Sequence, residues 1–66
     1  MNAILKVLPS GLYLEDKLTK EPILELSVNK RLSTLSKKSR HAIIAEHIRL
    51  CHHHGYHILL INKINY

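Results

Sequence analysis

The chain has 66 residues, one cysteine and a formal net charge of +5 at pH 7. A domain of this length buries only roughly 60% of the surface that its unfolded chain exposes, and a lone cysteine excludes an internal disulfide that would compensate. These properties predict one small, soluble, cytoplasmic domain over residues 1–66 that is not an enzyme. We expect no targeting segment, and no apolar run reaches the ~20 residues of a membrane-spanning helix.

The charges are divided unevenly along the chain. Residues 1–29 contain three lysines and four carboxylates, a net charge of −1, whereas residues 30–66 contain seven cations and Glu46 alone, a net charge of +6. A positive field of this kind attracts polyanions, so the second half is predicted to hold an interaction surface. Nucleic acid is the commonest partner of such a surface, and acidic proteins or anionic membranes respond to the same field.

The first half of the chain predicts three strands. Residues 3–8 are rich in Ile, Leu and Val, and residues 9–11 (Pro-Ser-Gly) form a turn that leads into a second strand over residues 12–15. Residues 16–21 are polar and charged, which is typical of another turn. Residues 23–28 then place apolar side chains at alternate positions, the pattern of a half-buried strand.

The second half predicts one long helix. Residues 29–39 form a basic polar connector, either a loop or a short helical turn, and the main helix is expected over residues 40–54. Ser36 or Ser39 provides the N-cap, and Gly55 suits the position just after the last turn. The apolar residues recur on one side of this helix, which indicates an amphipathic helix that covers a sheet.

The last predicted strand changes the expectation for the whole sheet. Residues 57–61 include four consecutive apolar side chains, which favours a strand buried on both faces. The fold class is therefore α+β, a single-layer sheet in the order β-β-β-α-β with one amphipathic helix packed on one face. Several apolar side chains can then point away from the helix: Ile4, Leu8, Tyr13, Ile23 and either Leu59 or Ile61.

A bare apolar face is rare on a soluble monomer, so we expect a homodimer. The alternatives are that the far face is patchy and tolerated, or that the 29–39 connector folds back over it.

The strongest candidate site is a run of cations around the predicted helix start. Lysine and arginine neutralise phosphates, and nearby hydroxyl groups and backbone N–H groups can hydrogen-bond them. Because aromatic residues are few and no zinc-finger, basic-zipper or RNP-type motif is present, we expect backbone-led contact, with duplex DNA first. The alternative is that the connector is a solvent-exposed loop whose charges serve solubility and bind no ligand. The predicted nucleic-acid-binding residues are Lys30, Arg31, Lys37, Lys38, Arg40 and Arg49.

Histidines form the second cluster. On a helical wheel His47, Cys51 and His54 lie within about 60° of one another, and His57 follows the helix as a possible fourth zinc ligand. The spacing matches no standard structural zinc site, and Glu46 points elsewhere, so we predict no metal and no cofactor. A Cys–His catalytic pair is geometrically allowed, but that helix face packs on the sheet.

The sequence therefore predicts a small non-catalytic nucleic-acid-binding protein. The alternative is a small protein-binding inhibitor or adaptor module, of the type found among phage and mobile-element accessory proteins, that acts on a larger host complex. Open strand edges and an apolar sheet face would provide its binding surface.

Overall fold

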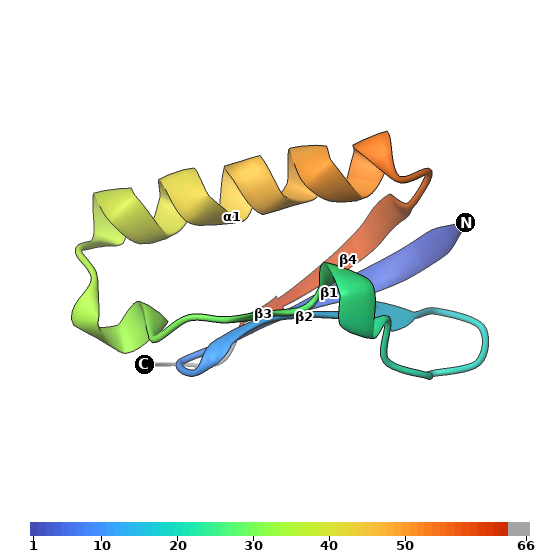
Figure 1. The fold of residues 1–66 in the computed structure, drawn as a ribbon, viewed down its shortest axis with the longest axis horizontal. Helices are drawn as coiled ribbons and strands as arrows, with labels where there is room; N and C mark the ends of the chain where they lie inside the picture. Colours follow the sequence, from blue (N-terminus) through green and yellow to red (C-terminus); the bar gives the residue numbers. More distant parts are fainter. Residues whose placement is uncertain (64–66) are drawn as a thin grey trace.

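A computed structural model describes residues 1–63 as a four-stranded sheet with one helix lying across one face (Figure 1). The strands are β1 (Asn2–Leu8), β2 (Gly11–Asp16), β3 (Val28–Asn29) and β4 (His57–Lys63), and the helix is α1 (Lys37–His53). Their order in the sheet is β3-β2-β1-β4. The predicted α+β class, with a small sheet and one packed helix, is confirmed.

Strand β1 is central to the sheet. It pairs antiparallel with β2 and parallel with β4. Because side chains alternate between the two faces of a strand, Ala3, Leu5 and Val7 all point toward α1, and all three are completely buried. Leu12 and Leu14 of β2 join them in the same hydrophobic core.

Helix α1 closes this core from above. Ile44, His47 and Cys51 are its buried residues, at spacings of three and four that keep them on one side of the helix. Leu26 and Leu32, from the segment between β2 and α1, complete the core. The buried face of α1 therefore includes a histidine among apolar side chains.

The helix begins earlier than predicted. The Ser36 side chain caps it by accepting a hydrogen bond from the Ser39 backbone N–H at 3.2 Å, so α1 starts at Lys37 and not at residue 40 of the expected range 40–54. At the other end His54 is the C-cap, and Gly55 adopts a φ of +86° that suits glycine. Residues 37–39, predicted as the end of the connector, therefore belong to α1.

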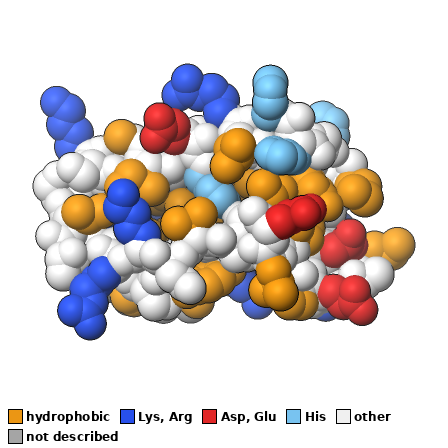
Figure 2. Space-filling model, in the orientation of Figure 1, with side chains coloured by type: hydrophobic (Ala, Val, Ile, Leu, Met, Phe, Trp, Pro, Cys, Tyr) orange, Lys and Arg blue, Asp and Glu red, His pale blue; other side chains and the backbone are white. Residues whose placement is uncertain are grey.

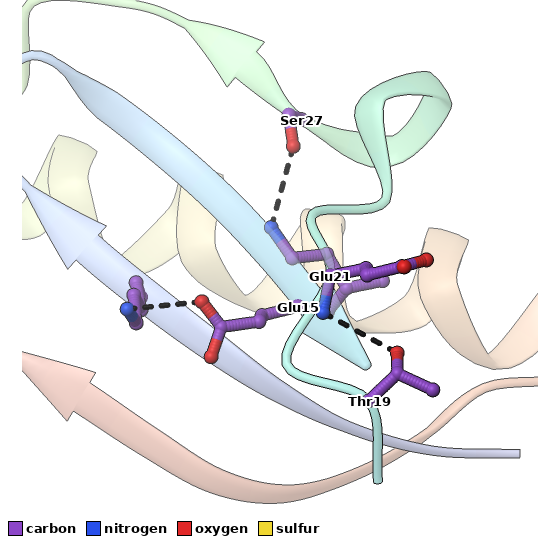
Figure 3. A network of polar contacts seen from close by, with 6 residues as sticks. Glu15, Thr19, Glu21 and Ser27 are labelled. Carbon is purple, nitrogen blue, oxygen red and sulfur yellow. Dashed lines mark hydrogen bonds and ion pairs between the residues drawn. The ribbon is translucent and has the colours of Figure 1, made fainter. Parts of the chain in front are cut away.

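The strand predicted over residues 23–28 is wrong for most of its length. The Ile23 N–H still donates to the Leu14 carbonyl oxygen at 2.8 Å, but the chain then forms a 3-10 turn, η1 (Leu24–Leu26), and returns to β2 only at β3. Ser27 explains the difference, because its hydroxyl donates to the Ile23 carbonyl oxygen at 3.0 Å. The same hydroxyl accepts from the Leu14 N–H at 3.4 Å (Figure 3). A side chain thus replaces a backbone ladder that the alternating pattern indicated.

The prediction that residues 57–61 are buried on both faces is also wrong. Strand β4 lies at the edge of the sheet, and Leu59, Leu60 and Ile61 are 53%, 54% and 38% exposed. Ile58 alone of its apolar residues packs against the core. The register with β1 slips by one residue between Ala3 and Ile4, so β4 follows β1 as a parallel but irregular neighbour.

The sheet face away from α1 has a mixed character. Ile4 is buried there, but Lys6 and Glu15 form an ion pair across it at 3.0 Å, and Tyr13 hydrogen-bonds to β3. Ile23, expected on this face, packs against the core instead. The far face is therefore not the broad apolar surface on which the expected homodimer depended, and the homodimer stays a prediction.

The two glycines provide a test of the close approach between β2 and β3. A Cβ at Gly11 would lie 2.2 Å from the Val28 carbonyl oxygen, whereas a Cβ at Gly55 would meet nothing within 4 Å. We expect Gly11→Ala to lower the free energy of unfolding by more than about 3 kcal/mol, because backbone must move. Gly55→Ala should cost only about 1–2 kcal/mol, from its left-handed conformation. Denaturant unfolding measures both, and equal losses of stability would contradict the packing described.

Candidate nucleic-acid interface

Folding brings three separate basic segments to one end of the molecule: the segment after β3, the start of α1 and the end of β4. The β1–β2 turn lies against the segment that follows β3, where the Lys30 N–H donates to the Ser10 carbonyl oxygen at 3.1 Å and the Leu32 N–H to the Pro9 carbonyl oxygen at 2.8 Å. The start of α1 stands above the same end (Figure 1). The loop after β2 lies at the opposite end.

We call this region the basic end and define it by its six cations, which are Lys30, Arg31, Lys37, Lys38, Arg40 and Lys63. Five of them were predicted as site residues, and the sixth, Lys63, was not. Lys63 and His41 line the same hollow, because the parallel β1–β4 pairing brings the end of β4 beneath the start of α1. The remaining predicted residue, Arg49, lies farther along the helix.

The first turn of α1 holds cations where a helix disfavours them. A helix N-terminus carries partial positive charge, so cations there cost about 0.3–1 kcal/mol each. Lys37, Lys38 and Arg40 occupy this turn, and it contains no acidic residue. Within residues 1–63 no carboxylate pairs with Lys37 or Lys38, while the Arg40 guanidinium donates to the Leu35 carbonyl oxygen at 2.6 Å. Within the described residues, the charges of Lys37 and Lys38 are therefore not offset by an ion pair.

The opposite end holds most of the carboxylates. Figure 2 shows most of the red carboxylate side chains gathered at the right-hand end, with Lys and Arg toward the left and along the helix. Asp16 ends β2, Glu21 lies in the loop that follows, and Glu25 lies in η1; Lys17 and Lys20 of the loop offset part of their charge. The uneven distribution of charge along the sequence thus becomes a separation of charge in space.

A groove of about 570 Å³ opens between α1 and β3 next to the basic end. Its polar lining residues include Lys30, Arg49, Glu46 and His53, and Figure 2 shows hydrophobic side chains exposed between the helix and the sheet. The apolar residues that line it are Leu12, Val28, Ile43 and Leu50. We call it the α1–β3 groove, and it gives Arg49 a position shared with Lys30 and not with the helix start.

His47 lies at the base of the α1–β3 groove. Its side chain is only 5% exposed, and its Nε2 has no hydrogen-bond partner among the residues described. Burial lowers the pKa of His47 below its ordinary value of 6.5, and a hydrogen bond to the Leu26 backbone opposes this shift in part. The ring is therefore held neutral within the core.

The four residues considered as metal ligands do not come together. His47 and Cys51 are buried, whereas His54 and His57 are exposed. In the described part of the chain, no group of three or more His, Cys, Asp or Glu side chains is arranged to hold a metal ion. Burial also raises the pKa of the Cys51 thiol, which disfavours the thiolate that nucleophilic chemistry needs.

Comparisons with models of protein families, with curated proteins and with solved structures find no match. None of the helical segments within residues 1–63 has the length and apolar character needed to cross a membrane.

The burial of His47 makes the stability of the fold depend on pH. Because its folded pKa lies below 6.5, the unfolded chain takes up a proton that the native ring does not when the pH falls through 6.5. Stability is then complete above that pH and declines below it. We expect the free energy of unfolding to fall by at most about 1.4 kcal/mol per pH unit in this window.

Urea unfolding at about pH 7.5 and about pH 5.5 measures this decline. The His47→Leu variant should show a smaller decline, because it has no buried imidazole to protonate. His54→Gln, which changes an exposed ring, is the matched control and should keep the decline of the unmodified chain. An undiminished decline in His47→Leu would contradict the role assigned to His47.

Proposed function

We propose that the protein binds nucleic acid without catalysis, and that its basic end contacts the phosphate backbone of duplex DNA. The observation that supports this most is the first turn of α1. Its cations lie where they destabilise the isolated helix, and an anionic ligand would reverse that cost. The charge distribution is thus better suited to a bound polyanion than to the free protein.

The groups around the helix start suit phosphate contacts. Lys30 and Arg31 lie on the segment before the helix, Lys37 and Lys38 lie on its first turn, and all four are exposed. Lysine contacts of this kind position a protein on the backbone but do not read the bases. We therefore propose modest sequence preference and an affinity that falls steeply with salt.

Charge reversal at the helix start separates binding from folding. The double variant Lys37→Glu/Lys38→Glu should weaken DNA binding for every sequence tested and reduce the log–log salt slope by about one for each phosphate that the variant no longer neutralises. The same change should raise the free energy of unfolding by about 0.3–1 kcal/mol per residue, because acidic side chains favour a helix N-terminus. Fluorescence anisotropy and denaturant unfolding measure the two effects.

The matched control is Lys17→Glu/Lys20→Glu, which changes the net charge equally but in the loop after β2, at the end of the molecule opposite the basic end. It should leave most of the affinity for DNA intact. Equal reductions in affinity in both double variants would indicate a response to net charge alone. No binding of the unmodified chain to duplex DNA, single-stranded DNA or RNA at low salt would remove the proposal.

The second candidate is a protein-binding inhibitor or adaptor, and the α1–β3 groove favours it. An apolar groove next to exposed cations suits an apolar side chain carried by an acidic segment of a partner. Lys37 and Lys38 do not line this groove. A complex formed through it should survive their reversal, whereas Leu50→Asp should disrupt that complex and leave DNA binding largely intact.

A further inference from the structure

The two edges of the sheet differ in how they are protected. Edge strands expose unpaired backbone groups, and proteins usually guard them with charges, proline, short length or a covering segment. The β3 edge has only two residues and continues into Lys30. The β4 edge has seven residues, and no strand of the described chain pairs with its outer side. Its two ends carry His57 and Lys63, with no charge between them.

The composition of β4 is that of an internal strand. Its run of consecutive apolar residues is typical of a strand with neighbours on both sides and cover on both faces. In the folded chain Leu59, Leu60 and Ile61 are instead 38–54% exposed. A strand paired with the outer side of β4 would satisfy its free backbone groups and cover part of this exposed apolar surface.

We propose that β4 pairs antiparallel with β4 of a second copy of the chain, about a twofold axis perpendicular to the sheet. The two sheets then form one continuous sheet, with both α1 helices on the same face. A second copy is the fitting occupant because an uncharged apolar strand is complementary to itself. This inference does not depend on the basic end or on nucleic acid.

The β1–β4 register fixes the face on which each β4 side chain lies, and we place the centre of the pairing at Ile61 on the helix face. Leu60 lies opposite Ile4 on the face away from α1, and Ile61 lies opposite Leu5 on the helix face. Antiparallel partners share a face. If the axis passes at Ile61, the two Ile61 residues face each other below the helices, and Lys63 lies opposite Leu59 of the other copy. No like charges are then directly opposed.

The same geometry places the two basic ends on either side of the axis. Lys63 at the end of β4 and His41 near the start of α1 line the same hollow. Antiparallel pairing reverses the direction of the second β4, so the two basic ends extend from the axis in opposite directions, with each Lys63 two positions from Ile61.

Sedimentation equilibrium of the unmodified chain and of two lysine variants tests the pairing. Ile61→Lys puts two like charges directly opposite each other and should raise the dimer dissociation constant by about tenfold or more. Leu24→Lys is the control, because Leu24 is 77% exposed on η1, away from β4. It should remain dimeric. A monomeric unmodified chain, or an Ile61→Lys variant as dimeric as the control, would overturn the proposal.

A cross-linking experiment tests the register independently of the lysine variants. Residues directly opposite each other in an antiparallel pair have Cβ atoms about 4.5–5.5 Å apart, within reach of a disulfide after small adjustment. Ile61→Cys should therefore form a disulfide-linked dimer under mild oxidation on a non-reducing gel. Leu24→Cys should not, and the native Cys51 is buried. Equal cross-linking in both variants, or none in Ile61→Cys, would overturn the proposed pairing.

Discussion

The packing of α1 over β1 is the constraint on which the other features depend. Ala3, Leu5 and Val7 are completely buried, and they can be so only if the helix crosses above the middle of the sheet. With β1 paired to β2 on one side, the chain that leaves α1 must add β4 on the other. Since β3 and β4 run in the same direction, the helix between them must run back along the sheet. The helix start and the end of β4 therefore share one end of the molecule.

Because of that arrangement, the difference in net charge between residues 1–29 and residues 30–66 becomes a separation of charge between the two ends of the molecule. The connector is held against the β1–β2 turn by backbone hydrogen bonds from Lys30 and Leu32. Its cations consequently add to those of the first helical turn and to Lys63. Asp16, Glu21 and Glu25 lie at the other end, where Lys17 and Lys20 offset part of their charge. A dipolar charge distribution of this kind favours one orientation when the protein approaches a polyanion.

The proposed dimer and the proposed function are compatible but independent. In the dimer two basic ends lie on either side of the twofold axis, so one duplex could contact both only if its path allows simultaneous engagement. The α1–β3 grooves lie on the side of each helix away from β4, since they are bounded by β3. Pairing through β4 therefore leaves the grooves and the cations of the connector and of α1 outside the paired strands, whereas Lys63 lies within them.

The amino-acid sequence alone determined the features that depend on neighbours a few residues apart. The turn at Gly11, a serine cap before α1, the glycine after it, the 3.6-residue period of Ile44, His47 and Cys51, and the α+β class were all predictable from local patterns. Five of the six cations of the basic end were also within reach, because they lie close together in the sequence. The sequence also predicted a strand over residues 57–61 that the structure confirms, extended to Lys63.

Tertiary structure decided what depends on residues far apart. The order β3-β2-β1-β4 placed an internal-type strand at an edge, and the pairing of Asn2 with His57 brought Lys63 to the basic end. Ser27 found a hydrogen-bond partner on β2, thirteen positions earlier, and turned an alternating segment into η1. No local pattern encodes these outcomes, because each depends on which distant backbone groups remain available once the core around Leu5 has formed.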